Sequence, residues 1–138
     1  MRTKQAQGVA LASAGGAVLV LAYIVLRQIR VVRHLPDPPG EVWDSDRIVM
    51  SKAARPLGVP DGVLGLGSYA ITAGLIASGS ELVRMKLVCD AGAAAFNVGR
   101  QVVKFRKMCS WCILAAGCTI PMVWFGWRSS GRRSFFRG

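Results

Sequence analysis

Three long stretches without a charged side chain constrain the fold of this chain more than any other feature. Residues 8–26 and 62–80 contain 19 residues each, and residues 108–127 contain 20. A helix needs about 20 apolar residues to cross roughly 30 Å of hydrocarbon, so each stretch is long enough to form a membrane-spanning helix. The sequence therefore predicts an integral membrane protein built from helices.

A fourth span is predicted between the second and third stretches. Residues 86–103 are mostly apolar and rich in small side chains, although Asp90, Asn97 and Arg100 interrupt them. A charge within a span is costly unless it faces the helix bundle or lies near an end, and Arg100 is close enough to the end to reach the interface. We therefore expect an all-α, integral membrane four-helix bundle. The prediction is one domain, residues 1–138, with spans at about 8–26, 60–80, 86–103 and 108–127.

The longest polar connection, residues 27–57, joins the first and second spans. It is the only segment long enough to form an extramembrane functional loop. Within it, residues 45–55 are predicted to form a short amphipathic helix with Ile48, Val49 and Met50 on its apolar side. Counting the crossings places this loop and the start of the fourth span on the same side of the membrane.

The net charge of +11 raises the possibility of nucleic-acid binding. The basic residues, however, lie in short clusters beside the apolar stretches and not on one soluble face, so membrane flanks explain them better. Of the 18 Lys and Arg residues, eight lie on the side of the two termini and ten on the side of the loop. Because the two sides are so similar, the positive-inside rule does not decide the orientation.

Cys109 and Cys112 form a Cys-x-x-Cys pair at the start of the last span. One helical turn apart, they are close enough to form a disulfide, to exchange electrons or to supply half of a metal site. The basic residues Lys104, Arg106 and Lys107 lie next to them. Nearby cations favour the reactive thiolate, which points to redox chemistry. The same spacing is also compatible with two structural cysteines. His34 is the only histidine and no second cysteine pair completes a four-ligand set, so no metal site is expected.

Three segments, in this order, resemble the vitamin K epoxide reductase (VKOR) family. Residues 45–52 (SDRIVMSK) are similar to that family's loop segment, and residues 57–69 (LGVPDGVLGLGSY) to the entrance of its second helix. The cysteine pair matches the head of its fourth helix. Together the segments span most of the chain and indicate a bacterial-type homologue. The resemblance implies a four-helix bundle around a quinone of the ubiquinone, menaquinone or vitamin K type.

The resemblance also implies roles for individual residues. Cys112 would face the quinone ring, and Cys109 would exchange disulfides toward the loop. Ser51 falls where the family keeps a serine near the quinone, and Asp61 falls where some members carry an asparagine that bonds a quinone oxygen. Ala116 occupies the position of a quinone-contacting tyrosine in animal members, which argues against vitamin K epoxide as the substrate.

The chain departs from the family in its loop, which contains no cysteine. Ser45 takes the place of the loop cysteine nearest the helix. Because serine forms no disulfide, the family's relay from a loop pair to the helix pair cannot run within this chain. Ser45 is therefore an engineered replacement, the mark of a member that works with one pair, or a sign of lost activity. If Ser45 stands in for the loop cysteine, it is expected to approach Cys109.

The function implied by the resemblance is that of a membrane thiol–disulfide oxidoreductase. It would couple quinone reduction to the oxidation of a thioredoxin-like or secreted dithiol protein. The expected location is the bacterial inner membrane or the endoplasmic reticulum, with the active site facing the periplasm or lumen. The alternative is a non-catalytic membrane scaffold or partner subunit of the same fold. An unrelated bacterial family with similar chemistry places its Cys-x-x-Cys before the second helix, and the order of segments here disfavours it.

Overall fold

The computed structural model describes residues 3–55 and 58–137; Leu57, the last residue of the predicted loop, lies outside the described residues. The elements are α1 (Thr3–Gln28), α2 (Ser45–Val49), η1 (Lys52–Ala54), α3 (Asp61–Ser78), α4 (Val83–Arg100), η3 (Gln101–Phe105) and α5 (Ser110–Arg137). Among the described residues, the only β-type pairing is an isolated bridge between Trp43 and Met108. The predicted all-α class is therefore confirmed.

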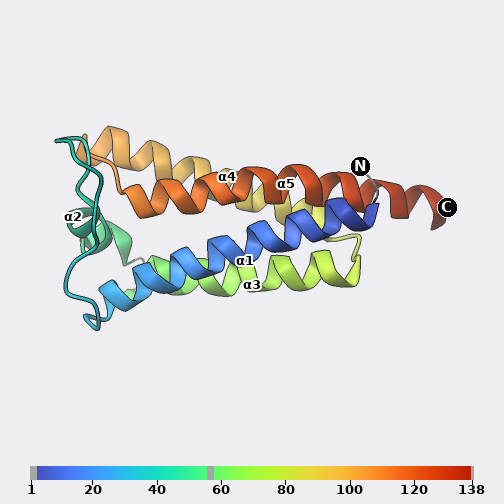
Figure 1. Ribbon diagram of the computed structural model, residues 1–138, viewed down its shortest axis with the longest axis horizontal. Helices are drawn as coiled ribbons and strands as arrows, with labels where there is room; N and C mark the ends of the chain where they lie inside the picture. Colours follow the sequence, from blue (N-terminus) through green and yellow to red (C-terminus); the bar gives the residue numbers. More distant parts are fainter. Residues whose placement is uncertain (1–2, 56–57, 138) are drawn as a thin grey trace.

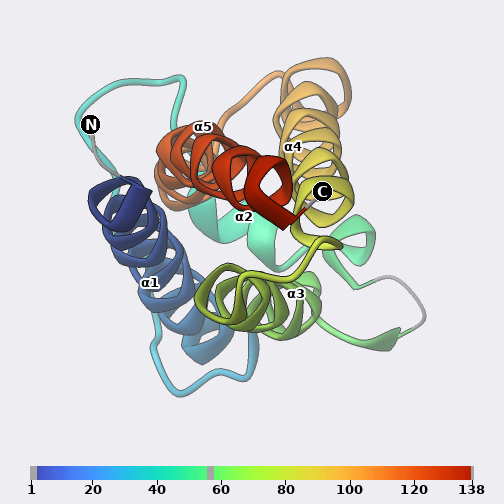
Figure 2. The same cartoon turned by 90° about the vertical axis from the view of Figure 1, so that its right-hand side faces the viewer.

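The four long helices lie lengthwise beside one another, with both chain ends at one end of the molecule and α2 at the other (Figure 1). The end-on view shows α1, α3, α4 and α5 arranged around a common axis, with α2 across the far end (Figure 2). Helix α1 packs against α5 and α3, while α4 packs against α5 and, less extensively, against α3. The loop and the start of α5 therefore share one end, as the count of crossings predicts.

Small side chains let α1 lie close to its neighbours. Ala6, Ala10, Ala14 and Ala17 are buried and recur every three or four residues, which places them on one face of the helix. Small side chains of this kind allow the close backbone approach that membrane helices use against each other. A Cβ added at Gly16 would lie 3.5 Å from the Sγ atom of Cys118 on α5. The helix interface of α1 is therefore set by its small residues.

Each predicted span overlaps one long helix, but the ends differ. Helix α4 starts before the predicted residue 86 because α3 ends early, at a glycine. Gly79 has φ 70°, and its N–H bonds to Ile76 O at 3.3 Å while that of Ser80 bonds to Leu75 O at 3.2 Å. These two bonds form a Schellman motif, which requires a left-handed residue at this position. The last residues of the predicted third span, 101–103, lie in the π-helical turn η3 and not in α4.

The predicted amphipathic helix over residues 45–55 is divided into two pieces. Helix α2 ends at Val49, and the 3-10 turn η1 begins at Lys52, after Met50 and Ser51. Ile48 and Val49 are 2% exposed and pack in the core beside residues of α1 and α5, so they do not lie on a membrane surface. The apolar side of this segment therefore plugs the end of the bundle.

In the part of the chain that the structure describes, two helices are long and apolar enough to cross a membrane. They are Lys4–Gln28, with a mean hydropathy of 2.4, and Ser110–Ser130, with 1.3. Only 28% and 22% of their most apolar windows are buried inside the molecule. An apolar helix in the core of a soluble protein would be buried on most sides. The low burial of these two helices therefore favours lipid as their surroundings.

Candidate active site

The residue just before α5 is Cys109, and its sulfur caps that helix. The N–H of Ile113 bonds to the carbonyl of Cys109 at 3.0 Å, and the N–H of Cys112 bonds to its Sγ at 3.2 Å. These are the bonds of a helix N-cap, made here by sulfur in place of the usual oxygen. The Cys109 sulfur thus lies at the N-terminus of α5, a position that lowers thiol pKa values and makes the nucleophilic thiolate more accessible.

The two thiols face different surroundings. Cys109 is 0% exposed within the core at the loop end of the bundle, and its N–H donates to Gln101 Oε1 at 2.9 Å. Cys112 is half-buried, and both cysteines are free thiols. Residues separated by one helical turn have Cα atoms within the range that a disulfide tolerates. The pair can therefore close into a disulfide with little movement of the backbone.

The loop between α1 and α2 is fastened to the segment that carries the cysteines. Met108 donates its N–H to Val42 O at 2.7 Å and accepts that of Asp44 at 2.9 Å. The indole of Trp111 donates to Pro36 O at 2.8 Å. The loop therefore covers the cysteine pair from the loop end of the bundle.

Ser45 lies fully buried against the residue that follows Cys109. Its Oγ accepts the N–H of Ser110 at 3.0 Å, and its own N–H donates to Asp37 Oδ2 at 3.0 Å. The hydroxyls of Ser45 and Ser110 both donate to Asp37 Oδ1, the latter at 2.6 Å. Partial burial raises the pKa of Asp37, but the hydrogen bonds from Ser110 and Ser45 outweigh it and hold this pKa below its usual 3.8. The Asp37 carboxylate thus ties the loop to the start of α5.

A second carboxylate ties the loop to the end of α1. Asp46 accepts hydrogen bonds from Arg27 Nε at 2.6 Å and from the N–H of Leu35 at 3.0 Å, and it pairs with His34. Partial burial raises the pKa of Asp46, but these bonds and the neighbouring positive charges together lower it below 3.8. Two ionised carboxylates therefore hold this region, Asp37 against the start of α5 and Asp46 against the end of α1.

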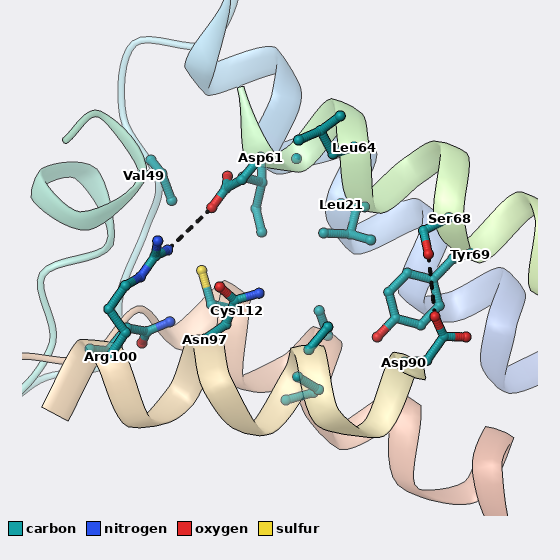
Figure 3. Close-up of a pocket in the computed structure, with 18 of the residues that line it drawn as sticks. Leu21, Val49, Asp61, Leu64, Ser68, Tyr69, Asp90, Asn97, Arg100 and Cys112 are labelled. Atoms are coloured by element: carbon teal, nitrogen blue, oxygen red, sulfur yellow. Dashed lines mark hydrogen bonds and ion pairs between the residues drawn. The ribbon is translucent and has the colours of Figure 1, made fainter. Parts of the chain in front are cut away.

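A cavity of about 300 Å³ lies among the long helices, with Val49 of α2 at one end of it (Figure 3). Apolar side chains of leucine, isoleucine, valine and alanine dominate its wall, and the sulfur-bearing residue in it is Cys112. The residues that line the cavity are Leu21, Ile24, Ile48, Val49, Asp61, Gly62, Leu64, Gly65, Ser68, Tyr69, Asp90, Ala93, Ala94, Asn97, Arg100, Gln101, Cys112, Ala115 and Ala116.

Polar groups gather at the end of the cavity that holds Cys112. Asp61 Oδ2 lies 3.5 Å from Arg100 Nη2, and Asp61 Oδ1 accepts Gln28 Nε2 at 2.9 Å. Gln28 is 1% exposed and also accepts the N–H of Gly62 at 3.3 Å. A Cβ at Gly62 would lie 2.6 Å from Gln28 Oε1, so this contact requires glycine. The close-up shows the Arg100 guanidinium and the Cys112 sulfur on the same side of the cavity (Figure 3).

A separate polar group lies at the opposite end of the cavity. Ser68 and Tyr69 on α3 and Asp90 on α4 line it. Ser68 Oγ lies 3.3 Å from Asp90 Oδ1, and the Tyr69 hydroxyl lies 2.5 Å from Thr119 Oγ1 on α5. Asp90 is 4% exposed, so it is the buried ionisable group of this end.

The structure brings together some of the predicted site residues but not all. Cys112, Asp61 and Ala116 line the cavity, and Ser45 lies beside the segment of Cys109 outside it. Ser51 is not among the lining residues. Its hydroxyl donates to Ile48 O at 2.7 Å in the turn after α2. The backbone bend that ends α2 therefore holds Ser51 in a local contact.

Sequence reasoning missed the partner of Arg100, which pairs with Asp61 across the bundle at 3.5 Å. Gln101, which lines the cavity at 2% exposure, was also missed. Asp90, Asn97 and Gln101 are spaced by seven and four residues, so they share one helix face. This periodicity of polar residues in an apolar segment was the signal that could have located the cavity.

Comparison with known protein families adds one match. A family model described as the vitamin K epoxide reductase family matches residues 8–127. No curated protein matches the chain, and no solved structure does. The matched range includes both cysteines of the pair, the loop, and the wall of the cavity.

Proposed function

The chain belongs to the vitamin K epoxide reductase family, and from this premise we propose that it is a quinone-coupled thiol–disulfide oxidoreductase of membranes. Members of the family are in general membrane oxidoreductases with a quinone as electron partner. The finer proposal is that this member oxidises dithiols in a thioredoxin-like or secreted protein and so forms disulfide bonds. Ubiquinone, menaquinone and vitamin K are the quinone classes considered.

The placement of the two thiols supports this proposal most strongly. Cys112 lines the cavity, whereas Cys109, one turn earlier, lies outside it under the loop. A pair arranged in this way has one sulfur at an internal binding site and the other toward the side from which a protein partner would approach. Two purely structural cysteines would need neither the cavity nor the N-cap contact.

The residues of the cavity fit a quinone ring. The volume of about 300 Å³ is at the small end of the range for ligand sites, and the wall is apolar with polar groups at both ends. Cys112 and Ala116 would contact the ring, and the Arg100 guanidinium, held by Asp61, would donate a hydrogen bond to one of its oxygens. When bound, a quinone supplies an acceptor for two electrons and two protons.

Thiol chemistry at Cys109 and Cys112 would supply these two electrons and two protons. Formation of one S–S bond between Cys109 and Cys112 releases two electrons and two protons. A partner thiolate then attacks Cys109 Sγ, and Cys112 leaves as a thiolate. The partner's second thiol displaces Cys109, which restores the pair and leaves the partner with a disulfide. Because the loop has no cysteine, the partner must react with Cys109 directly.

We propose that all four long helices cross the membrane, with the active site facing the periplasm or lumen. Large apolar side chains are exposed on each of the four long helices, among them Leu19 (73%), Ile71 (59%), Phe96 (68%) and Ile120 (71%). Exposed apolar area of this extent on a soluble protein would cause association. Lipid tails would cover it instead.

The test uses the purified full chain in detergent with ubiquinone-1 and a reduced thioredoxin-like protein, and follows quinone absorbance. The wild type should reduce the quinone and oxidise the partner in equal amounts. Cys112→Ala should abolish quinone reduction, and Cys109→Ala should stop turnover. Cys118→Ala is the matched control, since this half-buried cysteine lies on the same helix and not in the cavity wall.

A wild type that oxidises no dithiol partner, together with a Cys109→Ala/Cys112→Ala variant that is equally stable and well expressed, would favour a non-catalytic membrane scaffold or partner subunit.

A further inference from the structure

The end of the cavity away from Cys112 carries a charged pair that the thiol chemistry does not use. Lys86 Nζ lies 2.5 Å from Asp90 Oδ1, and Asp90 is 4% exposed. Removing two charges from water is unfavourable unless each finds several partners. A buried pair that borders a cavity in a membrane bundle is therefore a candidate for a role in ligand binding.

All three N–H groups of the Lys86 ammonium are engaged. They donate to Asp90 Oδ1, to Ser68 Oγ at 2.7 Å and to Thr72 Oγ1 at 2.7 Å. Thr72 in turn donates to Asp90 Oδ2 at 2.5 Å. Lys86 and Thr72 do not line the cavity among the described residues, whereas Ser68 and Asp90 do. The pair therefore reaches the cavity through the hydroxyl of Ser68 and the carboxylate of Asp90.

The hydroxyl hydrogen of Ser68 makes only a weak hydrogen bond, to the Asp90 carboxylate. The contact from Ser68 Oγ to Asp90 Oδ1 is 3.3 Å long, beyond the usual ~2.5–3.0 Å for a hydrogen bond between oxygens. The Ser68 oxygen accepts a hydrogen bond from the Lys86 ammonium, and such a bond polarises the hydroxyl and makes it a stronger donor. Ser68 can therefore turn its hydrogen toward an acceptor atom in the cavity.

We propose that Ser68, backed by the Lys86–Asp90 pair, binds the second carbonyl oxygen of the quinone. This deepens the proposed function and rests on it. Asp61, which holds the Arg100 guanidinium, and Ser68 lie seven residues apart on α3, which is roughly 10 Å along a helix. A para-quinone measures roughly 5 Å between its carbonyl oxygens, and a hydrogen bond of about 2.7 Å from Arg100 at one end and from Ser68 at the other brings the total to a similar length.

The two polar ends of the cavity then hold the two oxygens of one ring. The Lys86 ammonium, acting through Ser68, stabilises the negative charge that the inner oxygen gains during reduction. The subsite adds no reactant, because the Cys109/Cys112 pair already supplies two electrons and two protons. Lys86 and Asp90 are positioning residues, and Ser68 is the residue that touches the ligand.

The first test measures binding of ubiquinone-1 to the full chain in detergent by quenching of tryptophan fluorescence. Ser68→Ala should raise the dissociation constant about fivefold, the usual effect of losing one net hydrogen bond. Ser78→Ala is the matched control. Ser78 lies on the same helix, is exposed and donates a local hydrogen bond to Leu75 O, so the affinity of this variant for ubiquinone-1 should equal that of the wild type.

The second test separates charge from packing through the rate of quinone reduction in a single turnover. Removing one partner of a buried ion pair is strongly destabilising, so the neutral variant Lys86→Gln/Asp90→Asn changes both partners together. This variant should reduce the quinone at least tenfold more slowly than the wild type. Lys86→Arg, which keeps the charge, should restore most of the rate.

The outcomes distinguish this inference from the proposed function. If the wild type binds ubiquinone-1 and both Ser68→Ala and the neutral double variant bind and reduce it equally well, the inference is overturned while the proposed function stands. If the wild type itself binds no quinone, the proposed function fails and the inference fails with it.

Discussion

Asp37 should control how often the loop uncovers Cys109. Its carboxylate accepts three hydrogen bonds, two from Ser45 and one from Ser110, and these tie the loop to the start of α5. Asp37→Asn removes the charge and presents an amide N–H₂ to at least one of these donors. Hydrogen bonds to a charged group contribute about 1.5–3 kcal/mol, and for a half-buried side chain we take about 2 kcal/mol. Since 1.4 kcal/mol is tenfold in an equilibrium, the open loop should be roughly 30 times more populated.

Alkylation of Cys109 measures this opening, because the side chain is 0% exposed when the loop is closed. When the loop recloses faster than iodoacetamide reacts, the rate of Cys109 alkylation is proportional to the fraction of molecules in which the loop is open. Tandem mass spectrometry should show Cys109 of Asp37→Asn alkylated about 30-fold faster at pH 7 than in the wild type, by the free-energy estimate above. Glu41→Gln removes a charge from an exposed side chain of the same loop and should leave the rate unchanged. A rate for Asp37→Asn within twofold of wild type would refute the assigned role of the carboxylate.

Three further predictions concern the loop and the bundle. The pKa of Asp46 is lowered below 3.8 in the folded protein. The stabilisation that its ionised carboxylate provides is therefore complete above the pKa of Asp46 in the unfolded chain, and it is lost as the pH falls through the pKa in the folded protein. The melting temperature should therefore drop between pH 5 and about 3, and this drop should be smaller in Asp46→Asn; an equal drop contradicts the assignment. Gly62→Ala places a Cβ 2.6 and 2.9 Å from side-chain atoms of α1 and should destabilise by about 1–3 kcal/mol in thermal unfolding, whereas Gly67→Ala meets nothing within 4 Å and should not. Ser45→Cys should form a disulfide with Cys109 on mild oxidation, and its absence on non-reducing mass analysis would show that the loop is held too far away.

The sequence was enough to predict the long helices and to place the cysteines at the same end of the bundle as the loop. Uncharged stretches the length of a bilayer identify helices whatever their neighbours are, because the constraint comes from the solvent. The number of crossings then places the loop beside Cys109 and Cys112 without any knowledge of packing. The contact between Ser45 and the start of α5 was expected from the family resemblance, which sets Ser45 in the place of the loop cysteine nearest the helix.

The lining of the cavity could not be predicted in the same way. Asp61 and Arg100 lie on different helices, and their contact depends on which faces of α3 and α4 turn inward. Ser51 follows the bend at Met50 that divides the predicted 45–55 helix, and such a bend depends on tertiary packing against the bundle end. An apolar pattern predicts that a helix exists, but the rotation of one helix against another is set by side-chain packing.

The central claim is that the Cys109/Cys112 pair itself reduces the quinone, and a single-turnover experiment without oxygen or partner protein tests it most directly. The fully reduced chain is mixed with one equivalent of ubiquinone-1, and hydroquinone and free thiols are measured in the same sample. We predict one hydroquinone formed for each Cys109–Cys112 disulfide, with Cys89 and Cys118 still free. Hydroquinone without loss of these two thiols, or a disulfide formed without hydroquinone, would contradict the account.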